Sequence, residues 1–270
     1  MIKKLNTRHF IIDLFLGAAT TQLTIKQILI GAQIFNVSEN SIRVAVNRLV
    51  NEAMLETPER GIYQLSLHAQ TWANLMLNRK SGIKLTKEWN QKYLAILTTT
   101  LGRVDRTALK KRERVLEQFG FKALENHLYI RPDNLANSVD QIYLELQHLG
   151  LEPEAKMCVI EYFDQNTQQQ LSSLWDSDHL HKQYEHHIQT ISAWLKQYAV
   201  LSLEQAAFES FHLGKASVSL MMKDPLLPSP FVDEILRDQF IQIVQQLDQT
   251  GLQLWQNIYE HYDAPLKIAG

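Results

Sequence analysis

Two successive stretches near the N-terminus have the hydrophobic spacing of short helices. The first covers residues 24–35 and starts on a threonine, a residue type that favours the N-cap position. The second starts at Ser38, also a good N-cap, and runs to about Ala53. Its apolar positions share one face and consist of Ile42, Ala45, Val46, Leu49 and Val50. Only residues 36–37 remain for a tight turn between the two, so the pattern predicts a helix-turn-helix.

The segment from Leu55 to Leu67 has the pattern of a β-hairpin. Pro58 suits the first corner of a tight turn, and Gly61 supplies the left-handed residue that closes a bulged hairpin. Arg60 stands at the predicted tip. A helix-turn-helix followed by such a hairpin predicts a winged helix-turn-helix domain over residues 1–80.

A polar stretch at residues 78–84 predicts a linker, and the pattern changes after it. Short apolar runs then alternate with helical spacing over residues 88–165, in the order β-α-β-β-α-β of a ferredoxin-like domain. The predicted elements are strands at 93–100, 121–124, 128–131 and 157–163, the last of them buried, and helices at 106–119 and 137–149, the second ended by Gly150.

Helical spacing returns over residues 170–270 and is broken mainly at residues 224–230. We therefore expect a third, helical domain at the C-terminal end. The expected fold class is α+β and mostly helical, with a winged helix-turn-helix, a ferredoxin-like domain and a helical domain in that order.

Charged residues are distributed unevenly along the chain. The formal net charge of the chain is only -2, yet residues 1–124 hold 19 basic and 9 acidic side chains, and residues 125–270 hold 8 and 20. The basic part is therefore the part suited to a polyanion such as DNA. The alternative is two oppositely charged domains that pack on each other.

Cysteine content and hydropathy indicate the compartment. The single cysteine, Cys158, excludes an intrachain disulfide framework and any Cys-based metal site, which favours a reducing cytoplasm. Asp13 interrupts the apolar run at residues 10–19, so this run predicts a packed helix rather than a signal peptide. No apolar stretch reaches the ~18 residues of a membrane span, and no membrane partner is expected.

The polar face of the second helix carries side chains that read base pairs. Arg can form two hydrogen bonds with guanine and Asn with adenine, and Arg43 and Asn47 stand one turn apart. Arg48 and Ser41 flank them at positions suited to phosphates. The predicted contacts to double-stranded DNA are Lys26, Ser38, Asn40, Ser41, Arg43, Asn47, Arg48 and Arg60. The alternative is that these residues only solvate a surface helix.

Residues 38–55 resemble the recognition-helix segment of PaaX-type repressors of phenylacetate catabolism. The matching positions are Ser38, Ile42, Arg43, Ala45, Arg48, Leu49, Val50, Glu52 and Leu55. Further similarity lies at Trp89, Phe119–Phe121, His127–Pro132 and the distinctive Lys223–Pro228 segment. Two positions depart from the family pattern: Ala53 stands where a glycine is frequent, and residues 231–236 replace a Trp-Pro-Gly segment.

The resemblance implies a homodimeric transcriptional repressor that binds a palindromic operator. It also implies release from the operator by an aryl-acetyl-coenzyme A such as phenylacetyl-CoA, with no other cofactor. The middle domain of the family resembles small CRISPR-associated ribonucleases, whose metal-binding Asp ends the first strand. Residues 96–100 contain no acidic side chain, so the fold is carried over and the nuclease activity is not. We therefore expect a repressor without enzyme activity. The alternative is a nuclease built on the ferredoxin-like domain, with the winged helix as its targeting module.

Two further groups of residues leave alternatives open. Arg106, Lys110 and Arg114 share one stripe of a helix, where they would bind the phosphates of an acyl-CoA effector or simply solvate the helix. The spacing of a histidine group lacks a flanking carboxylate pattern, so it favours polar residues at the surface over metal ligands. Its members are His179, His181, His186 and His187. A pH-sensitive surface is a further alternative. We expect no metal site, and the common nucleotide-binding and hydrolase motifs are absent.

Overall fold

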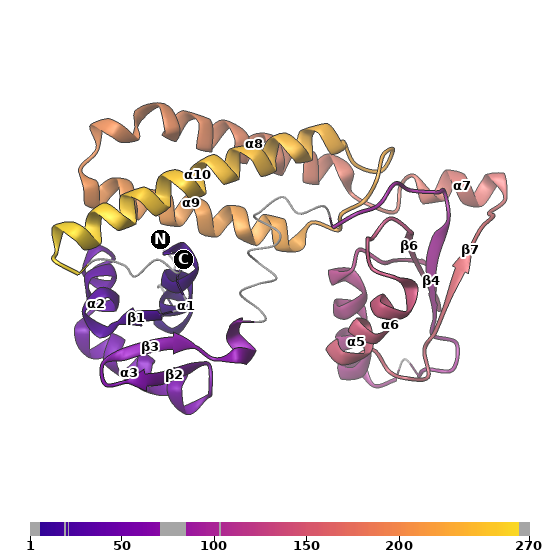
Figure 1. The fold of residues 1–270 in the computed structure, drawn as a ribbon. Coiled ribbons are helices and arrows are strands. Elements are labelled where there is room, and N and C mark those ends of the chain that lie inside the picture. The colour runs from indigo at the N-terminus through magenta and orange to yellow at the C-terminus, as the bar shows by residue number, and fades with distance from the viewer. Residues whose placement is uncertain (1–5, 19, 21, 71–84, 103, 265–270) are drawn as a thin grey trace. The chain divides into compact units, whose positions relative to one another are not determined.

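The computed structural model describes residues 6–18, 20, 22–70, 85–102 and 104–264 (Figure 1). The fold is α+β and mostly helical, with two small antiparallel sheets. The predicted linker at 78–84 lies outside the described residues. Among the described helices, none is both long enough and apolar enough to cross a membrane.

The chain divides into two compact units. The first contains residues 1–82, 187–219 and 241–270, and the second contains residues 83–186 and 220–240. Three long helices, α8 (Ser177–Gln197), α9 (Leu203–Lys223) and α10 (Glu234–His261), therefore contribute one part to each unit. The sequence predicts a separate helical domain over 170–270, whereas these helices complete the cores of both units.

The first unit opens with three short helices and a three-stranded sheet. The elements are α1 (Thr7–Gly17), β1 (Gln22–Thr24), α2 (Ile25–Ile34), α3 (Glu39–Asn51), β2 (Leu55–Glu59) and β3 (Ile62–Leu65). The strands pair antiparallel in the order β1-β3-β2. Figure 1 shows α3 beside the hairpin of β2 and β3, and α3 packs against β2.

Local hydrogen bonds explain where α2 and α3 begin. Thr24 and Gln27 form a reciprocal capping box at the start of α2. The Ser38 hydroxyl accepts from the backbone N–H of Ser41 at the start of α3. Between the helices Asn36 takes a left-handed backbone conformation (φ 54°), which Asn tolerates better than most residues. The turn therefore lies where the sequence predicts it.

Burial separates the two faces of α3. Ile42, Ala45, Val46 and Leu49 are buried, and Val50 is half-buried. The hairpin that follows has a register irregularity between Glu56 and Glu59, and Gly61 adopts φ 80°. A left-handed glycine at this point lets the two strands turn back within two residues.

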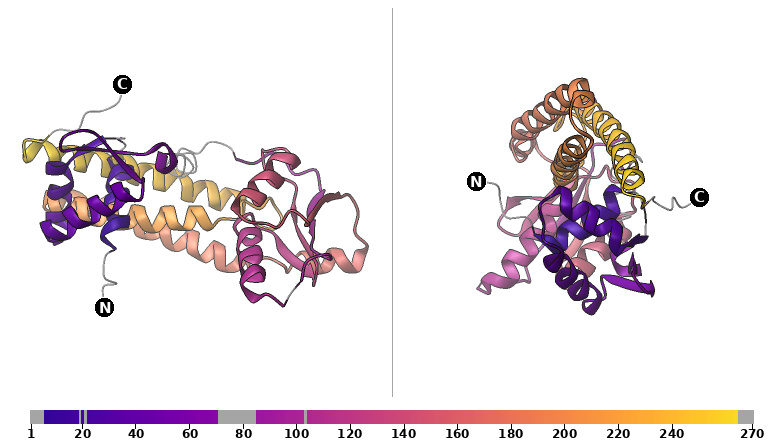
Figure 2. Two further views of the ribbon diagram at one scale, coloured as in Figure 1. Left: turned by 90° about the horizontal axis from the view of Figure 1, so that it is seen from below. Right: turned by 90° about the vertical axis from the view of Figure 1, so that its left-hand side faces the viewer.

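The second unit contains a four-stranded antiparallel sheet and two helices. Its elements are β4 (Tyr93–Leu97), α5 (Arg106–Gln118), β5 (Lys122–Glu125), β6 (Leu128–Pro132), α6 (Val139–Leu149) and β7 (Lys156–Ile160). The strand order is β5-β6-β4-β7. Figure 1 shows α5 and α6 on the same side of this sheet. They bury a core that includes Leu94, Ile96, Val115, Leu116, Ile142 and Leu146. Figure 2 shows the same chain from two further directions.

The last strand differs from the prediction of a buried strand over 157–163. β7 ends at Ile160, and none of its five residues is buried. Val159 exposes 41% of its surface and Tyr162, beyond the strand, exposes 79%. The apolar run suggests burial, but among the described strands β7 lies at the edge of the sheet and pairs with β4 alone.

After β7 the chain is helical apart from one long connection. The remaining elements are α7 (Gln165–Leu171), α8, a short 3-10 helix η1 (Tyr198–Val200), α9 and α10. The connection between α9 and α10 covers residues 224–233, the stretch where the sequence predicts a break.

Candidate nucleic-acid interface

The predicted DNA contacts gather on the exposed side of α3. Ser38 caps the helix, and all the predicted residues on the helix itself are exposed, namely Asn40, Ser41, Arg43, Asn47 and Arg48. Arg60 is exposed next to Gly61 in the turn of the β2–β3 hairpin. The first unit therefore exposes a mainly polar face of α3 and, in the hairpin turn, Arg60 next to Glu59.

Arg43 forms an ion pair with Glu39. Nε of Arg43 donates to Oε1 of Glu39 over 2.8 Å, one turn earlier on α3. Both side chains are more than half exposed, at 55% and 61%. Such exposed pairs contribute only about 0.3–0.5 kcal/mol, so Arg43 can leave Glu39 for a stronger acceptor at small cost.

The N-terminus of α3 offers hydrogen-bond donors. The hydroxyls of Ser38 and Ser41 lie 2.8 Å apart, and either of them can donate to the other. Backbone N–H groups at a helix N-terminus attract anions such as phosphate. Glu39 lies in the same first turn and competes for that positive end of the helix dipole.

Lys26 has a partner that is distant in sequence. Its Nζ donates to the backbone oxygen of Asp263 over 2.7 Å, and Gln27 Nε2 donates to the oxygen of Ala264 over 3.1 Å. These bonds tie the start of α2 to the end of the described chain. Local sequence patterns contain no signal for this role, because the partner lies 237 residues away.

The predicted contacts do not include Val44. It stands between Arg43 and the next turn of α3, and its side chain is 43% exposed. An apolar residue on an otherwise polar helix face was the available signal. In a major groove, the two methyl groups of a valine side chain can pack against the C5-methyl group of thymine.

Aromatic packing fixes the turn between α2 and α3. The ring of Phe35, which ends α2, lies 4.8 Å from Phe10 on α1 and 4.7 Å from Phe211 on α9. Trp255 on α10 stacks at 6.4 Å with an interplanar angle of 10°. Phe10, Phe211 and Trp255 are all buried. The C-terminal helices therefore hold α2 and α3 in place, a function that sequence spacing does not reveal.

An ion pair adds to this support. Lys215 of α9 contacts the carboxylate of Asp13 on α1. Burial raises the pKa of Asp13, and the hydrogen bond and charge of Lys215 oppose that rise. Asp13, the residue that interrupts the N-terminal apolar run, thus receives a partner from the far end of the chain.

The predicted effector residues are exposed on α5. Arg106, Lys110 and Arg114 all face solvent on one stripe. An open cavity of about 810 Å³ lies nearby in the second unit, lined by Leu97, Thr99, Glu113, Ala123, Leu124, Glu125, Asn126, His127, Leu128 and Tyr129. None of the three basic residues lines it. The three basic residues are therefore not part of this cavity.

Arg112 belongs to the same basic run but has a different role. It is buried, with 2% of its surface exposed, and it contacts Glu152. Its Nη2 lies 2.6 Å from Glu152 Oε1 and its Nε lies 3.0 Å from Oε2. The Arg112 hydrogen bond holds the pKa of Glu152 below its usual value, against the effect of burial.

The histidine group has ordinary hydrogen-bond partners. His181 Nε2 accepts from the backbone N–H of Asp233 over 2.8 Å, and His187 Nδ1 lies 3.2 Å from the Ser217 hydroxyl. Within the part of the chain that the structure describes, no group of three His, Cys, Asp or Glu residues is arranged to hold a metal ion.

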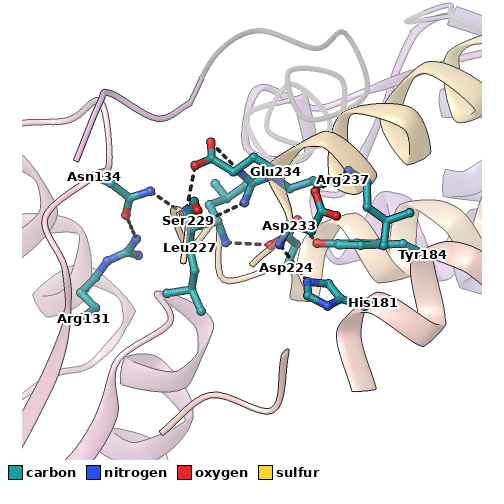
Figure 3. Close-up of polar contacts among 12 residues, drawn as sticks. Arg131, Asn134, His181, Tyr184, Asp224, Leu227, Ser229, Asp233, Glu234 and Arg237 are labelled. Carbon is teal, nitrogen blue, oxygen red and sulfur yellow. Dashed lines mark hydrogen bonds and ion pairs between the residues drawn. The ribbon is translucent and has the colours of Figure 1, made fainter. Parts of the chain in front are cut away.

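A buried polar network surrounds the connection between α9 and α10 (Figure 3). Asp224, which is 4% exposed, accepts from the Tyr184 hydroxyl over 2.6 Å and from the backbone N–H of Leu226 over 2.7 Å. Arg237 Nη1 donates to the Leu227 oxygen over 2.8 Å. Asn134 Nδ2 donates to the Leu226 oxygen over 2.7 Å.

The same network reaches the sheet of the second unit. Asn134 Oδ1 accepts from Nη2 of the buried Arg131 over 2.8 Å, and Arg131 also donates to the Phe119 oxygen. Gly120 has φ 75° and leaves no room for a side chain, since an added Cβ would lie 2.8 Å from Pro225 Cβ. Three segments that are separate in sequence, 119–121, 127–132 and 223–228, therefore meet here.

Comparison with known proteins identifies the fold but no activity. No family model and no curated protein matches the chain. Among solved structures, the uncharacterized protein Rv0674 from Mycobacterium tuberculosis has a similar fold, with a TM-score of 0.66 and 17% sequence identity. The match covers 93% of this chain and 98% of that chain. The likeness shows that the same architecture extends over nearly the whole of both chains.

Proposed function

We propose that this protein is a ligand-responsive transcriptional repressor, with α1 to β3 as a winged helix-turn-helix domain and α3 as its recognition helix. The observation that carries the proposal is the division of α3. One face is buried in the first unit, while the other exposes Arg43, Val44 and Asn47, and Arg60 is exposed in the hairpin turn that follows. A helix that is anchored on one side and rich in base-reading groups on the other suits a major groove.

Each exposed side chain has a distinct task in this proposal. Arg43 leaves Glu39 to form two hydrogen bonds with guanine, and Asn47 does the same with adenine. Arg48 and Ser41 bind phosphates and set the register of α3 in the groove. Arg60 contacts the DNA backbone or the minor groove from the hairpin tip. Lys26 has a smaller share, because it also binds the chain near Asp263.

The second unit supplies the effector response in this proposal. The element order from β4 to β7 and the strand order β5-β6-β4-β7 support a ferredoxin-like domain. Together with the sequence resemblance to PaaX-type repressors, this favours an aryl-acetyl-CoA such as phenylacetyl-CoA as the effector. The residues after β4 are Thr98–Thr100 and carry no carboxylate, which argues against a nuclease.

A homodimer would carry two recognition helices. Two-fold symmetry with helices about 34 Å apart matches successive major grooves and a palindromic operator. Effector binding would then favour a dimer in which the helix spacing no longer matches the DNA.

The test is a gel-shift titration on the DNA upstream of the protein's own gene. We expect specific binding that weakens steeply with salt, since phosphate contacts release counterions. Phenylacetyl-CoA should release the DNA and free phenylacetate should not. Binding without release by either compound would remove the effector proposal, and absence of salt-dependent DNA binding would remove the repressor proposal.

A further inference from the structure

The residues of α3 that point away from the core form a narrow ridge. The buried residues of this helix are Ile42, Ala45, Val46 and Leu49. At about 100° per residue, the direction opposite to them falls among four exposed residues that lie within roughly 60° of one another. These residues, which we call the α3 ridge, are Asn40, Val44, Asn47 and Asn51. They are the side chains of α3 that reach farthest toward another molecule.

The α3 ridge contains no charged side chain. Arg43 and Arg48 lie on its two sides, each about 70° from its centre. Glu39 lies farther round on the side of Arg43, to which it is bonded. In the part of the chain that the structure describes, the amides of Asn40 and Asn47 have no hydrogen-bond partner. The ridge therefore offers free amides and a pair of methyl groups, and charges border it on both sides.

Val44 contributes little to the fold. Its side chain is 43% exposed, and valine forms helices less readily than alanine, lysine or glutamate. A single exposed valine is common on protein surfaces, but this one lies between the free amides of Asn40 and Asn47. An apolar group at this place suits a partner that presents an apolar group between polar ones.

Base pairs differ in what they present to such a ridge in the major groove. Adenine presents an acceptor at N7 and a donor at N6, which match the donor and the acceptor of an Asn amide. Guanine presents two acceptors, so the amide oxygen would face an acceptor. Thymine carries a C5-methyl group, which cytosine lacks. Two amides and a valine therefore match A·T pairs better than G·C pairs.

We propose that the α3 ridge reads a centre of A·T base pairs in each half-site of the operator. The amides of Asn40 and Asn47 bind adenines, and the methyl groups of Val44 pack on the methyl group of a thymine. Asn40 and Asn47 are about 10 Å apart along the helix, which corresponds to about three base-pair steps when α3 follows the groove. The guanine proposed for Arg43 then lies at the border of this centre, because Arg43 lies to one side of the ridge. This inference rests on the proposed function and adds the base composition of the operator to it.

In the first experiment the full chain selects its own DNA from a random duplex library, and the bound sequences are determined. We expect half-sites with about three consecutive A·T pairs next to a G·C pair. Val44→Ala should lose the preference for thymine at one position and keep the other preferences. Val159→Ala on β7 is the matched control, because this valine of the second unit is similarly exposed, at 41%. It should select the same sequences as the wild type.

Base analogues test each contact without changing the protein. Deoxyuridine in place of the selected thymidine removes only the C5-methyl group. It should weaken wild-type binding about four-fold, the loss expected for one buried methyl group, and Val44→Ala should bind both DNAs equally. 7-Deazaadenine removes the N7 acceptor, and at one of the selected adenines it should weaken wild-type binding about five-fold. The same substitution should leave binding by Asn47→Ala unchanged.

Several results would overturn the proposal while leaving DNA binding intact. They are a G·C centre in the selected half-sites, wild-type protein that binds deoxyuridine or 7-deazaadenine as tightly as the natural base, and Val44→Ala that still distinguishes thymidine from deoxyuridine. A shift in selection by Val159→Ala equal to that by Val44→Ala would also overturn it. If no sequence is enriched at all, the proposed function fails first and this inference fails with it.

Discussion

Arg43 and Glu39 form an ion pair one turn apart on the exposed face of α3, with 2.8 Å between Nε and Oε1. In the proposed complex the same guanidinium has to reach a guanine, and the carboxylate faces the phosphates. In that complex Glu39 would weaken DNA binding, even though it stabilises the positive end of α3.

We expect Glu39→Gln to strengthen DNA binding by about 1 kcal/mol, roughly five-fold, since it removes both a repulsive charge and a competitor for Arg43. Fluorescence anisotropy at low salt measures the change. Glu52→Gln is a matched control, because Glu52 pairs with Arg8 near the other end of α3. Unchanged or weaker binding by Glu39→Gln would contradict this interpretation of the pair.

Substitution of the base-reading residues should change specificity. Arg43→Ala and Asn47→Ala should each cost about 1–3 kcal/mol of operator affinity and relax the preference at one base position. Binding to a panel of single-base operator variants measures both effects. Arg114→Ala on α5 is the control for Arg43→Ala, because it removes the same charge from a different helix. If both α3 variants keep full affinity, α3 is not the recognition helix.

The end of α3 holds an alanine in a conformation that suits glycine. Ala53 has φ 53°, and the backbone N–H groups of Ala53 and Met54 donate to the oxygens of Val50 and Leu49. This is the Schellman arrangement, in which the left-handed residue is usually glycine. We expect Ala53→Gly to raise the free energy of unfolding by about 1 kcal/mol, because an L-residue pays roughly 1–2 kcal/mol there.

Thermal and urea unfolding measure that change. Ala53→Val should shift stability in the opposite direction, since a β-branched side chain tolerates a positive φ poorly. A glycine variant less stable than the wild type would show that the strain at residue 53 is relieved in another way.

The Arg112–Glu152 pair predicts acid sensitivity of the second unit. The pKa of Glu152 is lowered in the folded state, mainly by the Arg112 hydrogen bond. The stabilisation is therefore complete above the unfolded pKa of about 4.3 and is lost as the pH falls through the lower folded value. Glu152→Gln should cost about 1–3 kcal/mol at neutral pH, because it leaves the buried guanidinium of Arg112 without its charge partner.

Unfolding curves between pH 3 and pH 7 test this pair. The difference between wild type and Glu152→Gln should shrink as the pH falls below about 4. Glu117→Gln is the control, because Glu117 pairs with Lys122 on the exposed surface. A difference that stays constant over the whole range would contradict the assignment.

Gly120 lies where segments 119–121, 127–132 and 223–228 meet. Gly120→Ala should destabilise the second unit by about 2–4 kcal/mol, since it adds both left-handed strain and a clash with Pro225. Gly102→Ala in the same unit should be nearly neutral, because nothing lies within 4 Å of its added Cβ. Equal stability of the two variants would mean that the connection between α9 and α10 can shift around residue 225 to accommodate the added methyl group.

The local features of this fold follow from neighbouring residues. The caps at Thr24 and Ser38 and the left-handed turns at Gly61 and Gly150 all lie at the predicted positions. Each depends on hydrogen bonds or backbone freedom within about five residues, so short patterns are enough to predict it. The exposed polar face of α3 follows in the same way from helical periodicity.

Tertiary packing determines the features that depend on residues far apart in the sequence. Sequence pattern cannot distinguish an apolar edge strand such as β7 from a buried one, because the difference is the presence of a neighbour on its outer side. It cannot separate the buried Arg112 from the exposed Arg114 without Glu152, or bring Gly120 to Pro225. Contacts between residues tens to hundreds of positions apart set these features, and no local periodicity encodes them.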